Sequence, residues 1–389
     1  MGADIILVLV IVGGLSFDFT NGFHDTANAM ATSIATGALK PRVAVGISAV
    51  LNFAGAFISI EVAATIAKGI INPKLLVGTE GLVLVLAALI GAMTWNLITW
   101  YLSIPSSSSH ALIGGIIGAT IIDAGVHAVN GTNLVSSVII PAIFSPLIAA
   151  FVAMLGTFGV YKMIRFIGKK WVDNGYRFGQ IGSASLVSLA HGTNDAQKTM
   201  GVISLALIAH GDISAAHFAV PLWVKFACAT AIAGGTATGG WRIINTMGNK
   251  ITDIEPPQGF AAETSTASVI LAGSYFGYPL STTQVVTGSV MGAGLGKKLA
   301  SVHWNVLGRM ATAWLFTIPA AGLLGAIAWG VSDIFGASSA VGSIVISILA
   351  AVGAFILWRL AQRSKVTPED LDRTDDPVTT SAAPAGAPA

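Results

Sequence analysis

Charged and amide side chains occur in two matching stretches of this chain that are otherwise apolar. The first stretch reads Thr20-Asn21-Gly22-Phe23-His24-Asp25-Thr26-Ala27-Asn28, and the second reads Ala190-His191-Gly192-Thr193-Asn194-Asp195-Ala196-Gln197-Lys198. Asp195 follows Asp25 by 170 residues. A carboxylate inside an apolar segment is costly unless it binds a cation, a proton or a partner. Repeated polar groups of this kind mark the path of a transported ion or solute.

Two hydroxyl-rich runs are repeated in the same order. They read Pro105-Ser106-Ser107-Ser108-Ser109-His110 and Pro279-Leu280-Ser281-Thr282-Thr283-Gln284, and Pro279 follows Pro105 by 174 residues. Serine and threonine favour helix N-caps, so each run predicts the N-terminus of a half-helix, with free N–H groups, the positive dipole end and hydroxyls together. Two such ends that face each other would bind a small tetrahedral oxyanion. The alternative is simple capping of two kinked helices.

The acidic residues suggest a coupling ion. Asp25 and Asn28 share a helix face, and with Asp195 their oxygens would suit sodium, the one candidate metal in this chain. His24 beside Asp25 favours proton coupling, although a neutral, structural histidine is an equal alternative. Lys198 stands where the first copy has Asn28, so it would either contact an anion or pair with Asp195.

Two further polar residues join the candidates for ion coupling. Asn194 stands at the position that matches His24. Glu263 lies well inside an apolar segment, where it is either a coupling carboxylate or a side chain that extends to the membrane surface.

The composition is that of a helical membrane protein. Of 389 residues, 54% are hydrophobic and 10% are charged, whereas a soluble domain carries about 25% charged residues. The single cysteine, Cys228, excludes an intramolecular disulfide and a thiolate metal cluster. No zincin motif, P-loop or Ser-His-Asp order is present, so we expect no enzyme.

Apolar stretches predict an all-α polytopic membrane protein with about 10 to 12 helical segments. The candidate stretches are 4–39, 43–67, 81–104, 105–122, 136–161, 183–209, 214–244, 260–279, 280–296, 304–331 and 337–361. The first would be about 54 Å long as a straight helix, so we expect it to break near Asn21-Gly22. Pro105 and Pro279 divide two other stretches into broken or re-entrant half-helix pairs.

The motif order predicts two repeats of one fold. We expect a first membrane repeat in residues 1–161, a basic connecting loop in 162–182, a second repeat with a final helix in 183–366, and a disordered tail in 367–389. The loop contains Lys162, Arg165, Lys169, Lys170 and Arg177, which favours the cytoplasmic side. The same bias places the tail in the cytoplasm and makes the second repeat inverted relative to the first.

These motifs resemble the signature of the PiT family of inorganic phosphate transporters. The resemblance rests on Gly22-Phe-His-Asp-Thr-Ala-Asn28, on His191-Gly-Thr-Asn-Asp195 and on both proline-hydroxyl runs, and it covers roughly residues 4–361. It implies an inverted-repeat symporter in which the hydroxyl runs hold phosphate. Asp25, Asn28, Asn194 and Asp195 then take the places of ion- and substrate-site residues, and Glu263 fills a typical glutamate position.

The resemblance also orders the alternatives. His24 and Lys198 are similar to the bacterial low-affinity branch, which implies proton symport at the plasma (inner) membrane and phosphate carried as a neutral complex with a divalent metal. The alternatives are a sodium-coupled phosphate symporter, a sulfate permease of the same fold and, from another class, an anion channel. We expect no resident cofactor, membrane lipid and phosphate as partners, and no nucleic acid; a homodimer is left open.

Overall fold

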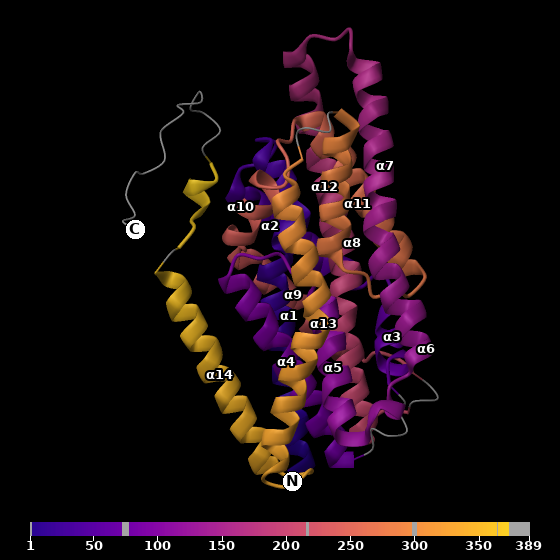
Figure 1. Cartoon of the computed structure of the whole chain (residues 1–389), viewed down its shortest axis with the longest axis vertical. Coiled ribbons are helices and arrows are strands. Elements are labelled where there is room, and N and C mark those ends of the chain that lie inside the picture. Colours follow the sequence, from indigo (N-terminus) through magenta and orange to yellow (C-terminus); the bar gives the residue numbers. More distant parts are fainter. Residues whose placement is uncertain (1, 72–77, 215–217, 298–301, 364, 373–389) are drawn as a thin grey trace.

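The computed structural model is a helical bundle (Figure 1) and describes residues 2–71, 78–214, 218–297, 302–363 and 365–372. Within these residues, five stretches are long and apolar enough to cross a membrane: α1 (Gly2–Ala35), α4 (Gly78–Tyr101), Gly131–Ile164, α13 (Trp304–Asp333) and α14 (Ala340–Gln362). Gly131–Ile164 joins α6 (Gly131–Leu134), a π-helical turn (Val135–Ile139) and α7 (Ile140–Ile164). The remaining helices are α2 (Pro41–Gly55), α3 (Glu61–Gly69), α5 (Ser108–Ala124), α8 (Lys169–His210), α9 (Leu222–Thr238), α10 (Trp241–Asn249), α11 (Pro256–Tyr275) and α12 (Thr282–Lys297). The predicted all-α polytopic membrane fold is confirmed.

Both predicted proline breaks are present. The chain leaves α4 through Ser103, which has a φ of 57°, and leaves α11 through Gly277, which has a φ of 73°. These left-handed residues stop the helices, and Pro105 and Pro279 follow two residues later. α4 and α5 therefore form one hairpin, and α11 and α12 form a second. Figure 1 shows α5 in the lower half of the bundle and α12 in the upper half.

The predicted break near Asn21-Gly22 is wrong, because α1 is one continuous helix of 34 residues. Glycine serves another purpose here. A methyl carbon built on Gly22 would lie 2.3 Å from the carbonyl oxygen of Ile232 in α9. A methyl carbon on Gly192 would lie 2.2 Å from the carbonyl oxygen of Asn52 in α2. The two matched glycines let backbones of neighbouring helices touch, as small residues do in membrane helix packing.

Three other segments differ from the expectation. The stretches 43–67 and 214–244 each contain two helices, α2 with α3 and α9 with α10. Most of the expected loop 162–182 belongs to α8, which begins at Lys169 and runs for 42 residues. The expected disordered tail begins with a 3-10 turn (Pro368–Asp370), capped by the Thr367 hydroxyl at 3.0 Å from Asp370 Oδ2. The rest of the tail, 373–389, lies outside the described residues.

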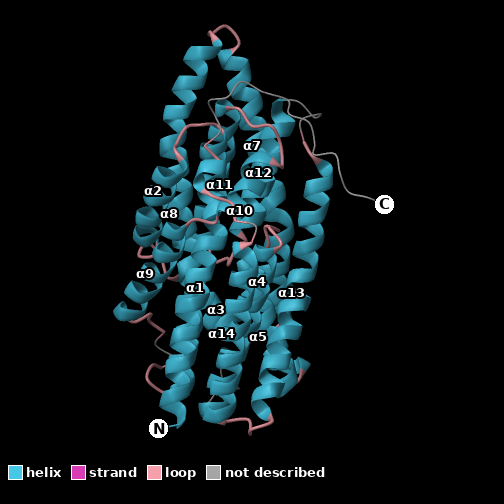
Figure 2. Ribbon diagram, turned by 90° about the vertical axis from the view of Figure 1, so that its left-hand side faces the viewer, coloured by secondary structure: helices cyan, strands magenta, loops and turns pink. Residues whose placement is uncertain are grey.

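The centre of the bundle is the contact between α1 and α8, which run in opposite directions. Asn21 Nδ2 donates to Asp195 Oδ2 at 3.2 Å, and Thr36 Oγ1 donates to Gln180 Oε1 at 2.7 Å. Residue numbers therefore rise along α1 as they fall along α8. In Figure 1, α1 begins at the lower end and α8 begins at the turn at the upper end. Figure 2 shows these helices running roughly along the long axis of the molecule.

The hairpin helices should tolerate no added methyl group at their glycine contacts. Methyl carbons on Gly118 of α5 and Gly292 of α12 would lie 1.9 Å from Gly322 O in α13 and 2.0 Å from Ala150 O in α7. We expect Gly118→Ala and Gly292→Ala each to destabilise the folded protein by about 1–3 kcal/mol through overpacking. The measurement is the thermal midpoint in detergent. Gly159→Ala in α7, which meets nothing within 4 Å, is the control; an equal loss there would contradict the argument.

Candidate functional site

The tips of the two hairpins meet inside the bundle. Ser107 Oγ caps α5 by accepting from His110 N at 3.1 Å. Ser281 Oγ accepts from Gln284 N at 3.3 Å in the same way. The tips also touch directly, since Ser109 Oγ donates to the carbonyl oxygen of Leu280 at 2.9 Å. The hydroxyl runs thus begin half-helices, as predicted, and both helix N-termini lie together.

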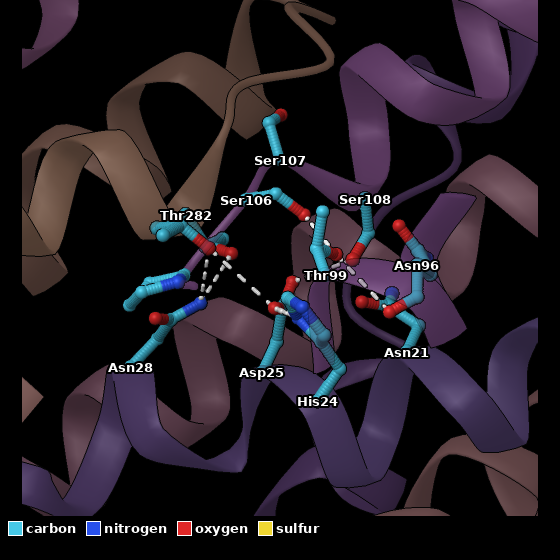
Figure 3. A network of polar contacts seen from close by, with 12 residues as sticks. Asn21, His24, Asp25, Asn28, Asn96, Thr99, Ser106, Ser107, Ser108 and Thr282 are labelled. Atoms are coloured by element: carbon cyan, nitrogen blue, oxygen red, sulfur yellow. Dashed lines mark hydrogen bonds and ion pairs between the residues drawn. The ribbon is translucent and has the colours of Figure 1, made fainter. Parts of the chain in front are cut away.

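The α1 side of this junction carries Asp25 and Asn28 (Figure 3). Ser108 Oγ donates to Asp25 Oδ2 at 3.2 Å, and Thr283 Oγ1 donates to Asp25 Oδ1 at 3.4 Å. Asn28 Nδ2 donates to Thr282 Oγ1 at 3.2 Å and to Thr283 Oγ1 at 3.0 Å. All of these side chains are buried. Asp25 therefore contacts both hairpin tips, whereas Asn28 contacts only the tip of α12.

The α8 side carries a fully buried ion pair. Lys198 Nζ lies 2.6 Å from Asp195 Oδ1, and both side chains have no exposed surface. Lys198 also donates to Ser109 Oγ at 2.5 Å and to the carbonyl oxygen of Leu280 at 2.9 Å. Thr282 Oγ1 donates to Asp195 Oδ2 at 3.5 Å. Lys198 is placed for both expected contacts, because the ammonium pairs with Asp195 and also lies at a helix N-terminus.

The two sides correspond at two pairs of positions. Each aspartate accepts from a hydroxyl in its own half of the chain, Ser108 for Asp25 and Thr282 for Asp195. The residue three positions later then reaches the other hairpin: Asn28 contacts Thr283, and Lys198 contacts Ser109. At this second position the two sides differ chemically, with an amide on one and an ammonium on the other.

Two histidines and an asparagine complete the cluster. His24 Nδ1 lies 2.5 Å from Asp25 Oδ1, and His191 Nε2 lies 3.4 Å from Asp195 Oδ2. One ligand atom each from Asp25, His191 and Asp195 fall within 4.8 Å of one another, so these residues could hold a cation. Sequence reasoning assigned no role to His191 or to Asn21, which also donates to Asp195. Their matched positions in the two copies were the available signal.

Glu263 lies in a separate polar site. Its Oε1 accepts from Thr32 Oγ1 at 2.7 Å and from Gln180 Nε2 at 3.0 Å, and its Oε2 accepts from Ser183 Oγ at 2.5 Å. The side chain is buried, so it does not extend to the surface. Thr32 follows Asp25 by two turns of α1, which places this site about 10 Å along the helix from the central cluster.

Two of the predicted residues point away from the cluster. The Ser106 hydroxyl lies 2.7 Å from Thr99 Oγ1 of α4. Asn194 Nδ2 donates to Ser274 Oγ at 2.8 Å and to the carbonyl oxygen of Tyr278 at 3.2 Å. Both side chains therefore hold a hairpin in place rather than line the junction between the tips.

Removing one member of the buried ion pair should destabilise the folded protein more than removing both members. Lys198→Met leaves the Asp195 carboxylate without its cation, and we expect a loss of about 3–5 kcal/mol in folding free energy. The double variant Lys198→Met/Asp195→Asn removes both charges and should recover part of that loss. Thermal midpoints of the purified variants give the comparison.

The control for this pair is Lys297→Met. Lys297 forms an ion pair with Glu255, and both side chains are about one third exposed, at 35% and 34%. The Lys297→Met substitution should lower the folding free energy by at most about 1 kcal/mol. A double variant less stable than Lys198→Met would contradict the prediction.

Comparison with known proteins gives a consistent result. The model of the phosphate transporter family matches residues 21–172 and 167–325. A probable low-affinity inorganic phosphate transporter of Mycobacterium tuberculosis (strain CDC 1551 / Oshkosh) is 55% identical over 361 residues, which cover 93% of this chain and 85% of that protein. One of the same description from Bacillus subtilis (strain 168) is 46% identical over 329 residues, 84% of this chain and 96% of that protein.

A solved structure has the same fold. It is that of a sodium-dependent phosphate transporter, with a TM-score of 0.74 and 24% sequence identity, and the match covers 83% of this chain and 97% of that one. The resemblance that the motifs indicated is therefore confirmed over most of the chain. The chain belongs to the phosphate transporter family, a family of membrane transporters and not of enzymes.

Proposed function

We propose that this chain imports inorganic phosphate by symport with protons. The observation that carries the proposal is the meeting of two hydroxyl-capped helix N-termini, α5 and α12, beside the Lys198 ammonium. Helix N-termini, hydroxyls and an ammonium are the groups that bind a tetrahedral oxyanion in proteins. Ser108, Ser109, Thr282, Thr283 and Lys198 are the proposed phosphate-binding groups, with Ser107 and Ser281 as caps.

The carboxylates of the cluster supply the reason for coupling. In this structure the hydroxyls of Ser108 and Thr282 donate to Asp25 and Asp195. A phosphate that takes over those hydroxyls must lie beside two carboxylates, and like charges repel strongly in a low-dielectric interior. Lys198 offsets the charge of Asp195. The charge of Asp25 remains, so a cation must enter with phosphate.

A proton on the His24–Asp25 pair fits this requirement. His24 is in direct contact with the carboxylate, and imidazole is the side chain best suited to bind and release a proton near neutral pH. Glu263 is the second proposed coupling residue. Its three hydrogen-bond donors hold a carboxylate at a fixed place on α1 and α8.

Sodium is the alternative coupling ion, and one observation favours it. Asp25, His191 and Asp195 have ligand atoms within 4.8 Å of one another, and Asn28 Oδ1 has no hydrogen-bond partner among the described residues. The carboxylate oxygens of Asp25 and Asp195 and the amide oxygen of Asn28 are ligands that suit a hard cation such as sodium. A divalent metal that travels with phosphate would use the same atoms and would be cargo rather than a resident cofactor.

Alternating access is proposed to follow from an inverted repeat in the plasma membrane. The antiparallel contact of α1 and α8, and the hairpins that enter from opposite ends, support that relation (Figure 1). Lys and Arg near the α7–α8 turn favour its placement in the cytoplasm. α14 ends toward the same end of the bundle, so the C-terminal segment would be cytoplasmic as well.

The test is labelled phosphate uptake into proteoliposomes, with a proton or a sodium gradient imposed separately. We expect a proton gradient alone to drive saturable uptake that excess sulfate does not inhibit. Uptake driven only by sodium would show that sodium is the coupling ion and would assign it to Asp25, His191 and Asp195. Strong competition by sulfate would indicate a sulfate permease. Uptake that never saturates would indicate an anion channel.

Substitutions in the cluster should separate binding from coupling. Asp25→Asn should abolish proton-driven uptake, because the neutral side chain no longer binds the coupling proton. Ser108→Ala and Thr283→Val each remove one hydroxyl and should raise the KM for phosphate about 10-fold, the cost of one hydrogen bond to a charged group. Thr312→Val, an exposed residue of α13, is the control. Full proton-driven uptake by Asp25→Asn would refute the assignment.

A further inference from the structure

A third carboxylate lies in α1, outside both polar sites described above. Asp18 precedes Asp25 by two helical turns, so the two residues share a face and lie about 10 Å apart along the axis. Asp18 is fully buried, with 0% of its surface exposed. On the other side of Asp25, Thr32 continues the same face and binds Glu263. One face of α1 therefore meets three buried carboxyl groups in succession.

A hydroxyl of α8 donates a hydrogen bond to Asp18. Thr199 Oγ1 of α8 donates to Asp18 Oδ1 at 2.6 Å. The second oxygen, Oδ2, has no hydrogen-bond partner in the part of the chain that the structure describes. No lysine, arginine or histidine nitrogen of those residues forms an ion pair with it. By comparison, Asp195 has a lysine, a histidine and an amide around it.

Few ionisable groups face Asp18. The Cys228 thiol faces it from α9. Asp195 and Lys198 lie further along α8 and bind each other. α4 carries ionisable side chains only near its two ends. Lys225, one turn before Cys228 in α9, is partly exposed. The surroundings thus contain no cation that would hold an ionised Asp18 in place.

These contacts suit a neutral carboxyl group. An ionised carboxylate without a cation is very costly inside the membrane. A hard metal ion needs several oxygen ligands, and among the described residues only Thr199 supplies a side-chain oxygen that binds Asp18. A proton needs no further ligand. We propose that Asp18 binds a coupling proton on the N-terminal side of the phosphate site.

This inference rests on the proposed proton symport and adds a second proton site to it. When that end of the bundle opens, a proton passes from the solution to the Asp18 carboxylate. The neutral acid then fits the closed, apolar surroundings, and the proton leaves toward the opposite solution only after the transporter has reoriented, so that it crosses with phosphate. Asp18 thereby makes closure of the N-terminal side dependent on a bound proton, separately from the charge balance at Asp25.

Asp18→Asn tests the proposal, because asparagine resembles a permanently protonated aspartate. In proteoliposomes we expect the stimulation of phosphate uptake by an imposed proton gradient to fall by at least about 10-fold. Exchange of labelled for unlabelled phosphate at equal pH should persist, since the phosphate site is intact. Asp18→Glu should restore the response to the gradient. An unchanged response in Asp18→Asn, or loss of exchange in a folded variant, overturns the proposal.

Infrared difference spectra of the purified protein give a second, independent measurement. At neutral pH, wild type minus Asp18→Asn should show a protonated carboxyl band that shifts in heavy water. If the asparagine variant does not fold, wild type minus Asp18→Glu should show the same band displaced. Absence of the band means that Asp18 is ionised, which overturns the proposal. Wild-type uptake that ignores the proton gradient instead overturns the proposed symport itself, so the two failures are distinguishable.

Discussion

The buried ion pair between Asp195 and Lys198 is the interaction on which the centre of this protein depends. An ammonium without exposed surface is stable only if its charge and its hydrogen atoms are all matched. Asp195, Ser109 and the Leu280 carbonyl do this together, and they come from α8 and from both hairpins. The pair therefore holds two broken helices, whose free backbone ends could not face lipid, against one continuous helix.

The cluster is nearly symmetric, whereas the carboxyl groups on either side of it are not. Asp25 and Asp195 have equivalent hydroxyl partners from the two hairpins. Asp18 corresponds to Ser188 in the second copy, and Glu263 corresponds to Leu89 in the first, so each lies on one side only. A symmetric scaffold favours neither direction of transport by itself. Under the proposed symport, unequal acidic groups at its two ends would give the two faces different responses to protons and cations.

Sequence patterns predicted where the half-helices begin better than they predicted the course of the long helices. Matched offsets located both half-helix N-termini, because a proline followed by hydroxyl residues has few other structural meanings in an apolar segment. Gly22 was misleading, since a glycine that lets two helices touch cannot be told from one that breaks a helix without knowing the neighbour. The partners of Glu263 were out of reach for the same reason: Gln180 lies 83 residues away in sequence. Gln180 also falls in the segment 162–182, whose basic residues are typical of a loop.

The length of α8 links the exposed end of the bundle to its centre. Lys169 is exposed, and the helix continues for 42 residues without a proline. Asp195 lies about 39 Å along it. A helix is stiff along its axis, so a shift of its exposed end is carried to the ion pair instead of being absorbed at a hinge. α8 thus transmits a displacement at the protein surface to the charges that hold the two hairpin tips.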